Sequence, residues 1–219
     1  MNIIGVSGLA GSGKDTVADI MLENEGFVKV SLADPLKRFM MDLWEFTPEQ
    51  LFGVSKHRND PDYRYPIGSD GFLSPRKALQ HLGTEGVRAI DQDAWIRYAI
   101  KTAKTLLGNT CAYYSPIDGL NYISQDYPIS SWKTKCITKA VIIGGVRFIN
   151  EFKCIKENGG KLIKVIRPGA GLKGCFANHP SETELSTIQD SEFDLVIQNT
   201  GTIDDLRKVV QEFVNNYIS

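Results

Sequence analysis

The residues most able to do chemistry form a glycine-rich stretch at 8–16, with the sequence GLAGSGKDT. An apolar run at 2–7 precedes it, and apolar side chains at helical spacing follow it, namely Val17, Ile20 and Met21. A strand, a glycine loop and a helix in this order are typical of a phosphate-binding loop. The backbone N–H groups of such a loop turn towards an anion, and the helix N-terminus adds partial positive charge. The sequence therefore predicts a phosphate site here.

Each polar residue of this loop has an expected role. Lys14 is expected to reach the β- and γ-phosphates of a nucleotide as a point charge. The next position usually holds a Ser or Thr that binds Mg²⁺, whereas here Asp15 follows the lysine and Thr16 comes after it. Asp15 is the candidate metal ligand, directly or through water, because Mg²⁺ prefers oxygen ligands. The predicted nucleotide-binding residues of the loop are Ala10, Gly11, Ser12, Gly13, Lys14, Asp15 and Thr16.

The rest of the chain predicts a sheet that would position this loop. Further apolar runs typical of strands lie at 27–32, 139–143, 161–166 and 193–197. Helical patterns separate them, which predicts a parallel sheet covered on both faces. Ligands of such sheets bind at the carboxyl ends of the strands. The charged residues that follow four of the strands are therefore expected to gather there, namely Lys14, Asp34, Arg147 and Arg167.

The connecting segments are less regular. Residues 53–75 are polar, aromatic and rich in turn residues, and they predict an ordered loop or lid. Residues 109–138 contain scattered aromatic side chains, and a β-hairpin with Asp118-Gly119 at its turn is plausible there. Thr47 and Thr202 each stand where a helix N-cap is expected.

Composition excludes several classes of protein. The 219 residues include 25 basic and 26 acidic ones, so no global positive charge argues for nucleic-acid binding. No apolar run approaches the ~20 residues of a membrane span. The four cysteines form no C-x-x-C pair, which favours reduced thiols in the cytoplasm over a zinc or redox site. We expect one globular α/β domain that acts on small molecules.

Several segments beyond the loop resemble phage deoxynucleoside monophosphate kinases. They are SLADPLK at 31–37, QHLGTE at 80–85 with Arg88, Trp95-Ile96, GVRF at 145–148 with Asn150-Glu151, HPSE at 179–182 and NTGT at 199–202. The resemblance spans most of the chain except 109–138. It implies an adenylate-kinase-like P-loop fold, with three α/β/α layers and a five-stranded parallel sheet in the order 2-3-1-4-5. The implied single domain has a core at 1–32 and 139–219, an acceptor-binding region at 33–108, an insertion at 109–138 and a lid at about 168–190.

The resemblance implies ATP-dependent phosphorylation of deoxynucleoside monophosphates with Mg²⁺, in the cytoplasm (the host's, if the chain is viral). A homodimer is possible, without nucleic acid or membrane partners. Transfer between two anions requires several converging cations. The candidate catalytic residues are Lys14, Arg88, Arg147 and Arg167. The candidate acceptor contacts are Asp34, Lys37, Arg76, Gln80, Arg88, Trp95 and Arg147, and the candidate adenine contacts are Asn199, Gly201 and Thr202.

Alternatives stay open at this point. Asp34 and Thr202 also suit plain helix caps, and Trp95 also suits a hydrophobic core. The family usually has an Asp where Gly145 stands, so either Asp15 orients Mg²⁺ or phosphates and water hold it. Other small phosphorylated acceptors, of the dephospho-coenzyme A or phosphomevalonate type, would suit the same loop. So would a catalytically weak nucleotide-binding relative, whereas a GTPase lacks support because neither of its base-reading and switch motifs occurs.

Overall fold

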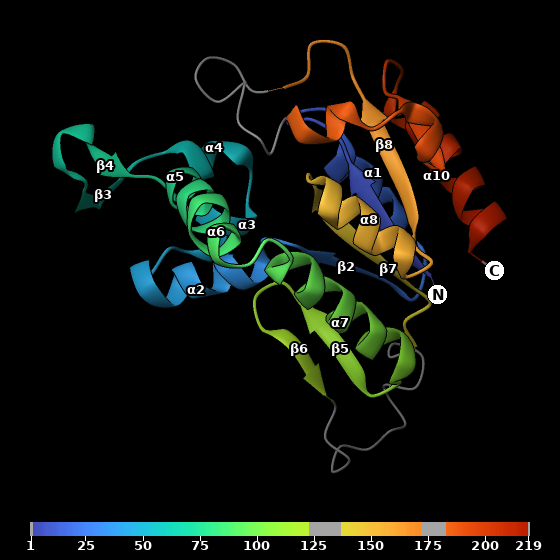
Figure 1. Cartoon of the computed structure of the whole chain (residues 1–219), viewed down its shortest axis with the longest axis horizontal. Coiled ribbons are helices and arrows are strands. Elements are labelled where there is room, and N and C mark those ends of the chain that lie inside the picture. The colour runs from blue at the N-terminus through green and yellow to red at the C-terminus, as the bar shows by residue number, and fades with distance from the viewer. Residues whose placement is uncertain (1, 123–136, 172–182, 219) are drawn as a thin grey trace. The chain divides into compact units, whose positions relative to one another are not determined.

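The computed structural model describes residues 2–122, 137–171 and 183–218 (Figure 1). The chain divides into two compact units. The first comprises Met1–Leu32, Ile96–Tyr114 and Leu120–Ser219, and the second comprises Ala33–Trp95 and Ser115–Gly119. None of the described helices is both long and apolar enough to cross a membrane.

The first unit is built on a parallel sheet. Its five strands are β1 (Ile3–Ser7), β2 (Phe27–Ser31), β7 (Ala140–Val146), β8 (Lys161–Ile166) and β9 (Leu195–Gln198). They lie in the order β2-β7-β1-β8-β9, and every neighbouring pair is parallel. Counted along the chain, this is the expected order 2-3-1-4-5. The predicted α/β fold is confirmed.

Helices cover both faces of this sheet. They are α1 (Lys14–Leu22), α7 (Ala94–Gly108), α8 (Ile149–Glu157) and α10 (Ile203–Tyr217). On one face, α1 and α10 share a buried apolar cluster with strand residues that include Ile4 and Ile142. Gly5 points to the opposite face, where Ile155 of α8 packs so close that a side chain at position 5 would collide with it. This alternation along β1 is what a strand buried on both faces requires.

The second unit has a smaller core of its own. Its elements are α2 (Asp34–Trp44), α3 (Pro48–Phe52), α4 (Ser55–Asn59), β3 (Asp62–Pro66), η1 (Gly68–Asp70), β4 (Phe72–Leu73), α5 (Pro75–Gln80), the π-helix η2 (His81–Val87) and α6 (Arg88–Ile90). Buried Leu36, Met40, Phe46, Leu51 and Ala78 form the core. Residues 53–75 were expected to form an ordered loop or lid, and the prediction of a loop is wrong, because this stretch contains α4 and the paired strands β3 and β4.

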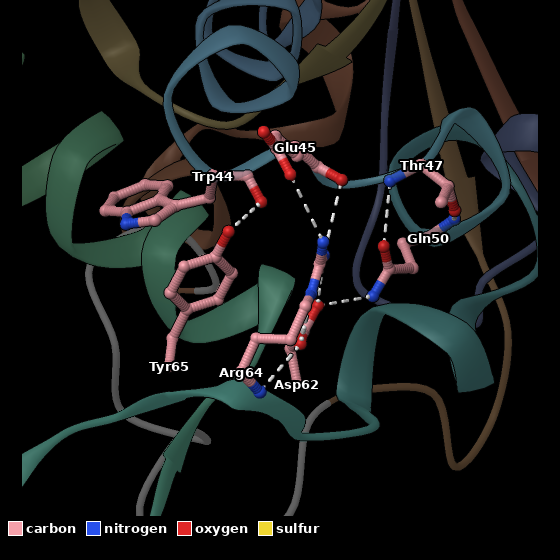
Figure 2. Close-up of polar contacts among 7 residues, drawn as sticks. All are labelled: Trp44, Glu45, Thr47, Gln50, Asp62, Arg64 and Tyr65. Carbon is pink, nitrogen blue, oxygen red and sulfur yellow. Dashed lines mark hydrogen bonds and ion pairs between the residues drawn. The ribbon is translucent and has the colours of Figure 1, made fainter.

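A polar network fixes β3 within this unit (Figure 2). The Asp62 carboxylate, only 8% exposed, accepts hydrogen bonds from Arg64 Nε at 2.9 Å and Nη2 at 2.8 Å. It also accepts one from Gln50 Nε2 at 3.1 Å. Arg64 continues to the Glu45 carbonyl at 3.3 Å, where α2 has just ended. The network therefore joins the strand to the α2–α3 connection.

A short hairpin occupies part of the expected insertion. Its paired strands are β5 (Ala112–Ser115) and β6 (Gly119–Tyr122), so the predicted hairpin with Asp118-Gly119 at its turn is confirmed. Gly119 has φ of 83°, a left-handed conformation that glycine adopts without steric cost. The remainder of that insertion, at 123–136, lies outside the described residues.

Candidate phosphate-binding site

The glycine loop connects β1 to the first turn of α1. Gly13 has φ of 95° and directly precedes Lys14, the first residue of the helix. A side chain at position 13 would also run into the Asn199 amide group. Both the left-handed backbone and the close approach require glycine here. The loop thereby reaches the N-terminus of α1, where the helix dipole favours an anion.

Lys14 lies within the loop that it serves. Its side chain is 9% exposed, and Nζ donates to the Leu9 carbonyl at 3.4 Å. On another side, Nζ lies 3.8 Å from Asp15 Oδ2. A long hydrogen bond to a carbonyl is weaker than one to a phosphate oxygen, which also carries charge. The ammonium group is therefore held where an entering phosphate could attract it.

Ser12 gives a second sign of a ligand. It is 1% exposed, and its Oγ is the one buried side-chain oxygen or nitrogen in the described part of the chain that has no hydrogen-bond partner. A buried hydroxyl without a partner costs about 1–3 kcal/mol. A phosphate oxygen in the loop is the kind of acceptor that would remove this cost. The residues present thus fit a phosphate group.

Asn199 ties the end of the sheet to the loop. Its Nδ2 donates to the Ser12 carbonyl at 2.8 Å, and its backbone N donates to the Ile166 carbonyl at 2.7 Å. Thr202 caps α10, because Oγ1 accepts from the Asp205 N–H at 3.2 Å and donates to Asp205 Oδ2 at 2.7 Å. Hydrogen bonds to its carboxylate from the Thr202 hydroxyl, and then from the Thr202 backbone N–H, lower the pKa of Asp205. The predicted adenine contacts therefore lie beside the loop at Asn199 and at a helix cap at Thr202, and Gly201 is exposed between them.

Arg147 follows β7 after an irregularity in the strand. Val6 pairs with Gly144 and Ser7 with Val146, so Gly145 is an extra residue, a β-bulge with φ of 82°. The backbone N–H of Arg147 donates to Glu151 Oε2 at 2.7 Å. Bulges bend a strand and re-aim the side chains that follow. The bulge thus sets where the half-buried Arg147 leaves the sheet.

Glu184 binds the first residue of α8, next to Arg147 and its bulge, and our sequence analysis missed this role. Its Oε1 accepts from the backbone N–H of Ile149, the first residue of α8, at 2.9 Å. The two residues are 35 positions apart, so no local pattern could have linked them. Glu184 begins the short helix η5 (Glu184–Thr187), within the segment expected to form a lid. The HPSE motif of that lid, with His179 and Glu182, lies outside the described residues.

Asp15 and Arg167 differ in how they are held. Asp15 is 72% exposed and lies between two ammonium groups, with Oδ1 3.8 Å from Lys29 Nζ and Oδ2 3.8 Å from Lys14 Nζ. Arg167 is exposed just beyond β8, and its carbonyl accepts from the Ala170 N–H at 3.1 Å. Within the described ranges no group of three or more His, Cys, Asp or Glu side chains could hold a metal ion. One carboxylate beside the loop suits a Mg²⁺ bound mainly by phosphate oxygens.

In the second unit, two predicted acceptor contacts lie at the start of α2. Asp34 is 2% exposed, and its Oδ1 lies 4.0 Å from Lys37 Nζ. Lys37 also places Nζ 4.5 Å from the centre of the Phe52 ring, a cation–π contact. A buried carboxylate next to a mostly buried ammonium is unusual for a helix start, because burial of charge is costly. The N-cap of α2 is Ala33 and the helix begins at Asp34, so the alternative of a plain cap at Asp34 is wrong.

The remaining predicted acceptor contacts lie along α5 to α7. Arg76 Nε donates to Asn59 Oδ1, and Arg88 Nη1 donates to the Gln92 carbonyl at 2.9 Å. Gln80 and Arg88 stand immediately before and after the π-helix η2. Trp95 is half-buried against the core, and its Nε1 donates to the Gly83 carbonyl within that π-helix at 3.0 Å. π-Helical turns occur often at functional sites.

A family model and a sequence relative indicate the same family. A family model described as deoxynucleotide monophosphate kinase matches residues 2–62. A relative from Acanthamoeba polyphaga mimivirus, provisionally named a deoxynucleotide monophosphate kinase, is 33% identical over 220 residues. That alignment covers 99% of this chain and 97% of the relative. It therefore includes residues of both units.

Similar solved structures are more distant. One is a dephospho-CoA kinase from Campylobacter jejuni, with 14% identity and a TM-score of 0.43, covering 98% of this chain and 96% of that one. Another is a sugar kinase from Janibacter, with 11% identity and a TM-score of 0.42, covering 98% of this chain and 95% of the other. Sequence identities and TM-scores this low carry no information about the substrate of this chain.

Proposed function

Because the chain belongs to the deoxynucleotide monophosphate kinase family, and is thus a phosphotransferase, we propose that it transfers the γ-phosphoryl group of ATP to a deoxynucleoside monophosphate. The observation that carries this proposal is the pair of groups in the glycine loop. Lys14 Nζ is buried on a loop carbonyl, and the Ser12 hydroxyl is buried without a partner in the described chain. Both groups suit the phosphates of a nucleotide.

The transfer itself needs little covalent help from the protein. An oxygen of the acceptor phosphate attacks the γ-phosphorus, and the bond from that phosphorus to the β-phosphate oxygen breaks, which leaves ADP and a diphosphate. No general base is required, because the attacking oxygen is already ionised. The protein instead positions the two anions and balances their charge. Mg²⁺ bound to the phosphates would supply further positive charge, and Asp15 is the residue proposed to face it.

We assign the donor to the first unit and the acceptor to the second. Lys14, Ser12 and Asn199 belong to the first unit, and the helix dipole of α1 adds partial positive charge to that of Lys14. Lys37, Arg76 and Arg88 belong to the second unit and are the cations proposed for the acceptor phosphate. Arg147 and Arg167 follow strands of the first unit and are proposed to stabilise the transferring group. Arginine suits both tasks because its planar group binds phosphate oxygens in pairs.

The decisive experiment compares acceptors under one set of conditions. The purified protein would be given ATP, Mg²⁺ and, separately, dGMP, dTMP, dCMP, dAMP, dephospho-coenzyme A or phosphomevalonate, and ADP formation would be measured. We expect turnover with at least one deoxynucleotide and none with the last two acceptors. Turnover of only a non-nucleotide acceptor would refute the proposed substrate. Tight ATP binding without turnover of any acceptor would instead indicate a binding protein.

A further inference from the structure

The groups around Asp15 extend into a row of alternating charges that leads away from the glycine loop. Lys14 faces Asp15 at 3.8 Å, Asp15 faces Lys29 at 3.8 Å, and Lys29 Nζ donates to Asp19 Oδ1 at 3.1 Å. Three of the four belong to α1, whereas Lys29 comes from β2. Neither a motif nor the family resemblance singles out Lys29.

The sheet register explains why Lys29 reaches α1. Lys29 pairs with Ile142 in the parallel ladder between β2 and β7, so both side chains leave the same face of the sheet. Ile142 packs in the cluster that α1 covers, which places Lys29 under the same helix. Gly144, two residues beyond Ile142, has no side chain, and a Cβ there would lie 3.3 Å from Lys29 Cε. The glycine leaves room for the lysine stem.

Burial separates Lys29 from an ordinary surface lysine. Its side chain is 25% exposed, whereas its partners Asp15 and Asp19 are 72% and 65% exposed. Lysines on edge strands commonly serve to prevent edge-to-edge pairing, and β2 is an edge strand. Lys29 instead lies towards the helix, with its ammonium group at two carboxylates. Because pairs with exposed partners add little stability, stability alone is a weak reason for this arrangement.

We propose that Lys29 is a positioning residue of the phosphate site that acts through Asp15. A carboxylate next to a phosphate-binding lysine has two harmful effects on anion binding, because it repels the phosphate and competes for the ammonium group of Lys14. The Lys29 ammonium attracts Asp15 from the side away from Lys14 and balances its charge. Asp19 in turn holds Lys29. The chain thus tolerates an acidic residue immediately after the loop lysine.

This inference rests on the proposed nucleotide binding at the loop, and a double-mutant cycle tests it without catalysis. ADP binding would be measured by calorimetry in EDTA for the unmodified protein, Lys29→Met, Asp15→Asn and the double variant. We expect Lys29→Met to weaken ADP binding about three- to fivefold in the unmodified background, the range typical of a partly exposed ion pair. In the Asp15→Asn background the loss should shrink to less than ~1.5-fold, because interacting residues are not additive.

Control variants separate positioning from folding. Lys29→Arg keeps the charge and should restore most of the affinity. Lys161 is another strand lysine; it lies at the amino end of β8 and is paired with Asp194. Lys161→Met should leave ADP affinity unchanged. Thermal melting of each variant would report any loss of folding. An affinity loss that follows a fall in melting temperature, and that Lys29→Arg does not restore, would contradict the proposal.

The remaining outcomes are also distinguishable. An equal loss of affinity in both backgrounds would mean that Lys29 attracts the phosphate directly, and it would overturn the proposal. The absence of any loss of ADP affinity in Lys29→Met would also overturn the proposal. If the unmodified protein failed to bind ADP at all, the proposed function would be refuted and this inference with it.

Discussion

At the scale of single residues, sequence reasoning predicted the chemical groups but not how they are held. The loop pattern predicted Lys14 and Ser12, but it could not show that one rests on a carbonyl and the other has no partner among the described residues. Gly145 is a clearer case. From the family resemblance, it marks a missing aspartate. In the structure, it is a bulge residue with φ of 82°, which an aspartate would adopt only with strain.

Removal of the Ser12 hydroxyl should affect the stability of the nucleotide-free protein and its affinity for ADP differently. In Ser12→Ala, we expect the nucleotide-free protein to unfold at the same or a higher temperature, because a buried oxygen without a partner is removed. ADP binding should weaken about tenfold or more, because a hydrogen bond to a charged phosphate is lost. Thermal melting and calorimetry would measure the two effects.

Ser74→Ala offers a matched control for that prediction. Ser74 caps α5, where its Oγ accepts from the Lys77 N–H at 3.3 Å. Its removal should lower stability by about 1 kcal/mol and leave ADP affinity unchanged. If both serine variants lost stability and kept affinity, Ser12 would have no role in binding phosphate.

Lys14 carries the catalytic prediction at this scale. Lys14→Met should lower kcat by at least about 100-fold, because positive charge that stabilises the transferring group is lost. Melting temperature should change little. Steady-state kinetics with a saturating acceptor would measure the effect, and a kcat within a few fold of the unmodified protein would refute the assignment.

At the scale of elements, local signals predicted well where the interaction is local. The predicted caps at Thr47 and Thr202 were both confirmed. They could be predicted because a capping residue and its partner are only three positions apart. The elements at 53–75 were missed. Their strand β3 is held by Asp62, whose partner Gln50 lies twelve positions away. The π-helix η2 was missed too, since apolar residues at Leu79, Leu82, Val87 and Ile90 fit an ordinary helix equally well.

The Asp62 network predicts sensitivity to acid. Hydrogen bonds from Arg64, and then from Gln50, lower the pKa of Asp62 in the folded state. A lowered pKa contributes stability above the unfolded value of about 4, and this stability is lost as pH falls below it. Asp62→Asn should therefore cost about 1–3 kcal/mol at neutral pH, and this cost should begin to shrink below about pH 4 and go on shrinking as pH falls towards the lower pKa of the folded state. Urea unfolding between pH 2.5 and 7 would measure this decline of the difference, and a constant difference across the range would refute it.

Trp95 allows a test of the π-helix. In Trp95→Phe the ring keeps its place in the core, but the hydrogen bond to the Gly83 carbonyl is lost. If η2 positions Arg88 for the acceptor, the acceptor KM should rise about three- to tenfold while the ATP KM stays constant. Equal rises in both KM values would argue for a general loss of folding instead.

At the scale of the whole molecule, the order of strands in the sheet was predictable, whereas the contacts that hold the second unit together were not. Alternating strands and helices leave few arrangements, and the resemblance selected one of them. The second unit depends on contacts such as those around Phe46 and Leu51, which no periodic pattern encodes.

The assignment of donor and acceptor to separate units has a kinetic signature. Arg88→Ala should raise the acceptor KM about tenfold or more and change the ATP KM less than threefold, because a charge-assisted contact to the acceptor is lost. Arg207→Ala removes an exposed arginine paired with Glu23 and should alter neither constant. A larger effect of Arg88→Ala on ATP would remove Arg88 from the acceptor site.

The two half-buried indoles of the second unit have a practical consequence. The chain has three tryptophans, of which Trp44 and Trp95 lie in the second unit and Trp132 lies outside the described residues. The glycine loop and α1 contain none. Once Trp132 is replaced by phenylalanine, tryptophan fluorescence, excited selectively over that of the eight tyrosines, will originate entirely from the unit assigned to the acceptor. Optical titrations with a monophosphate and with ADP could then follow that unit without an added label.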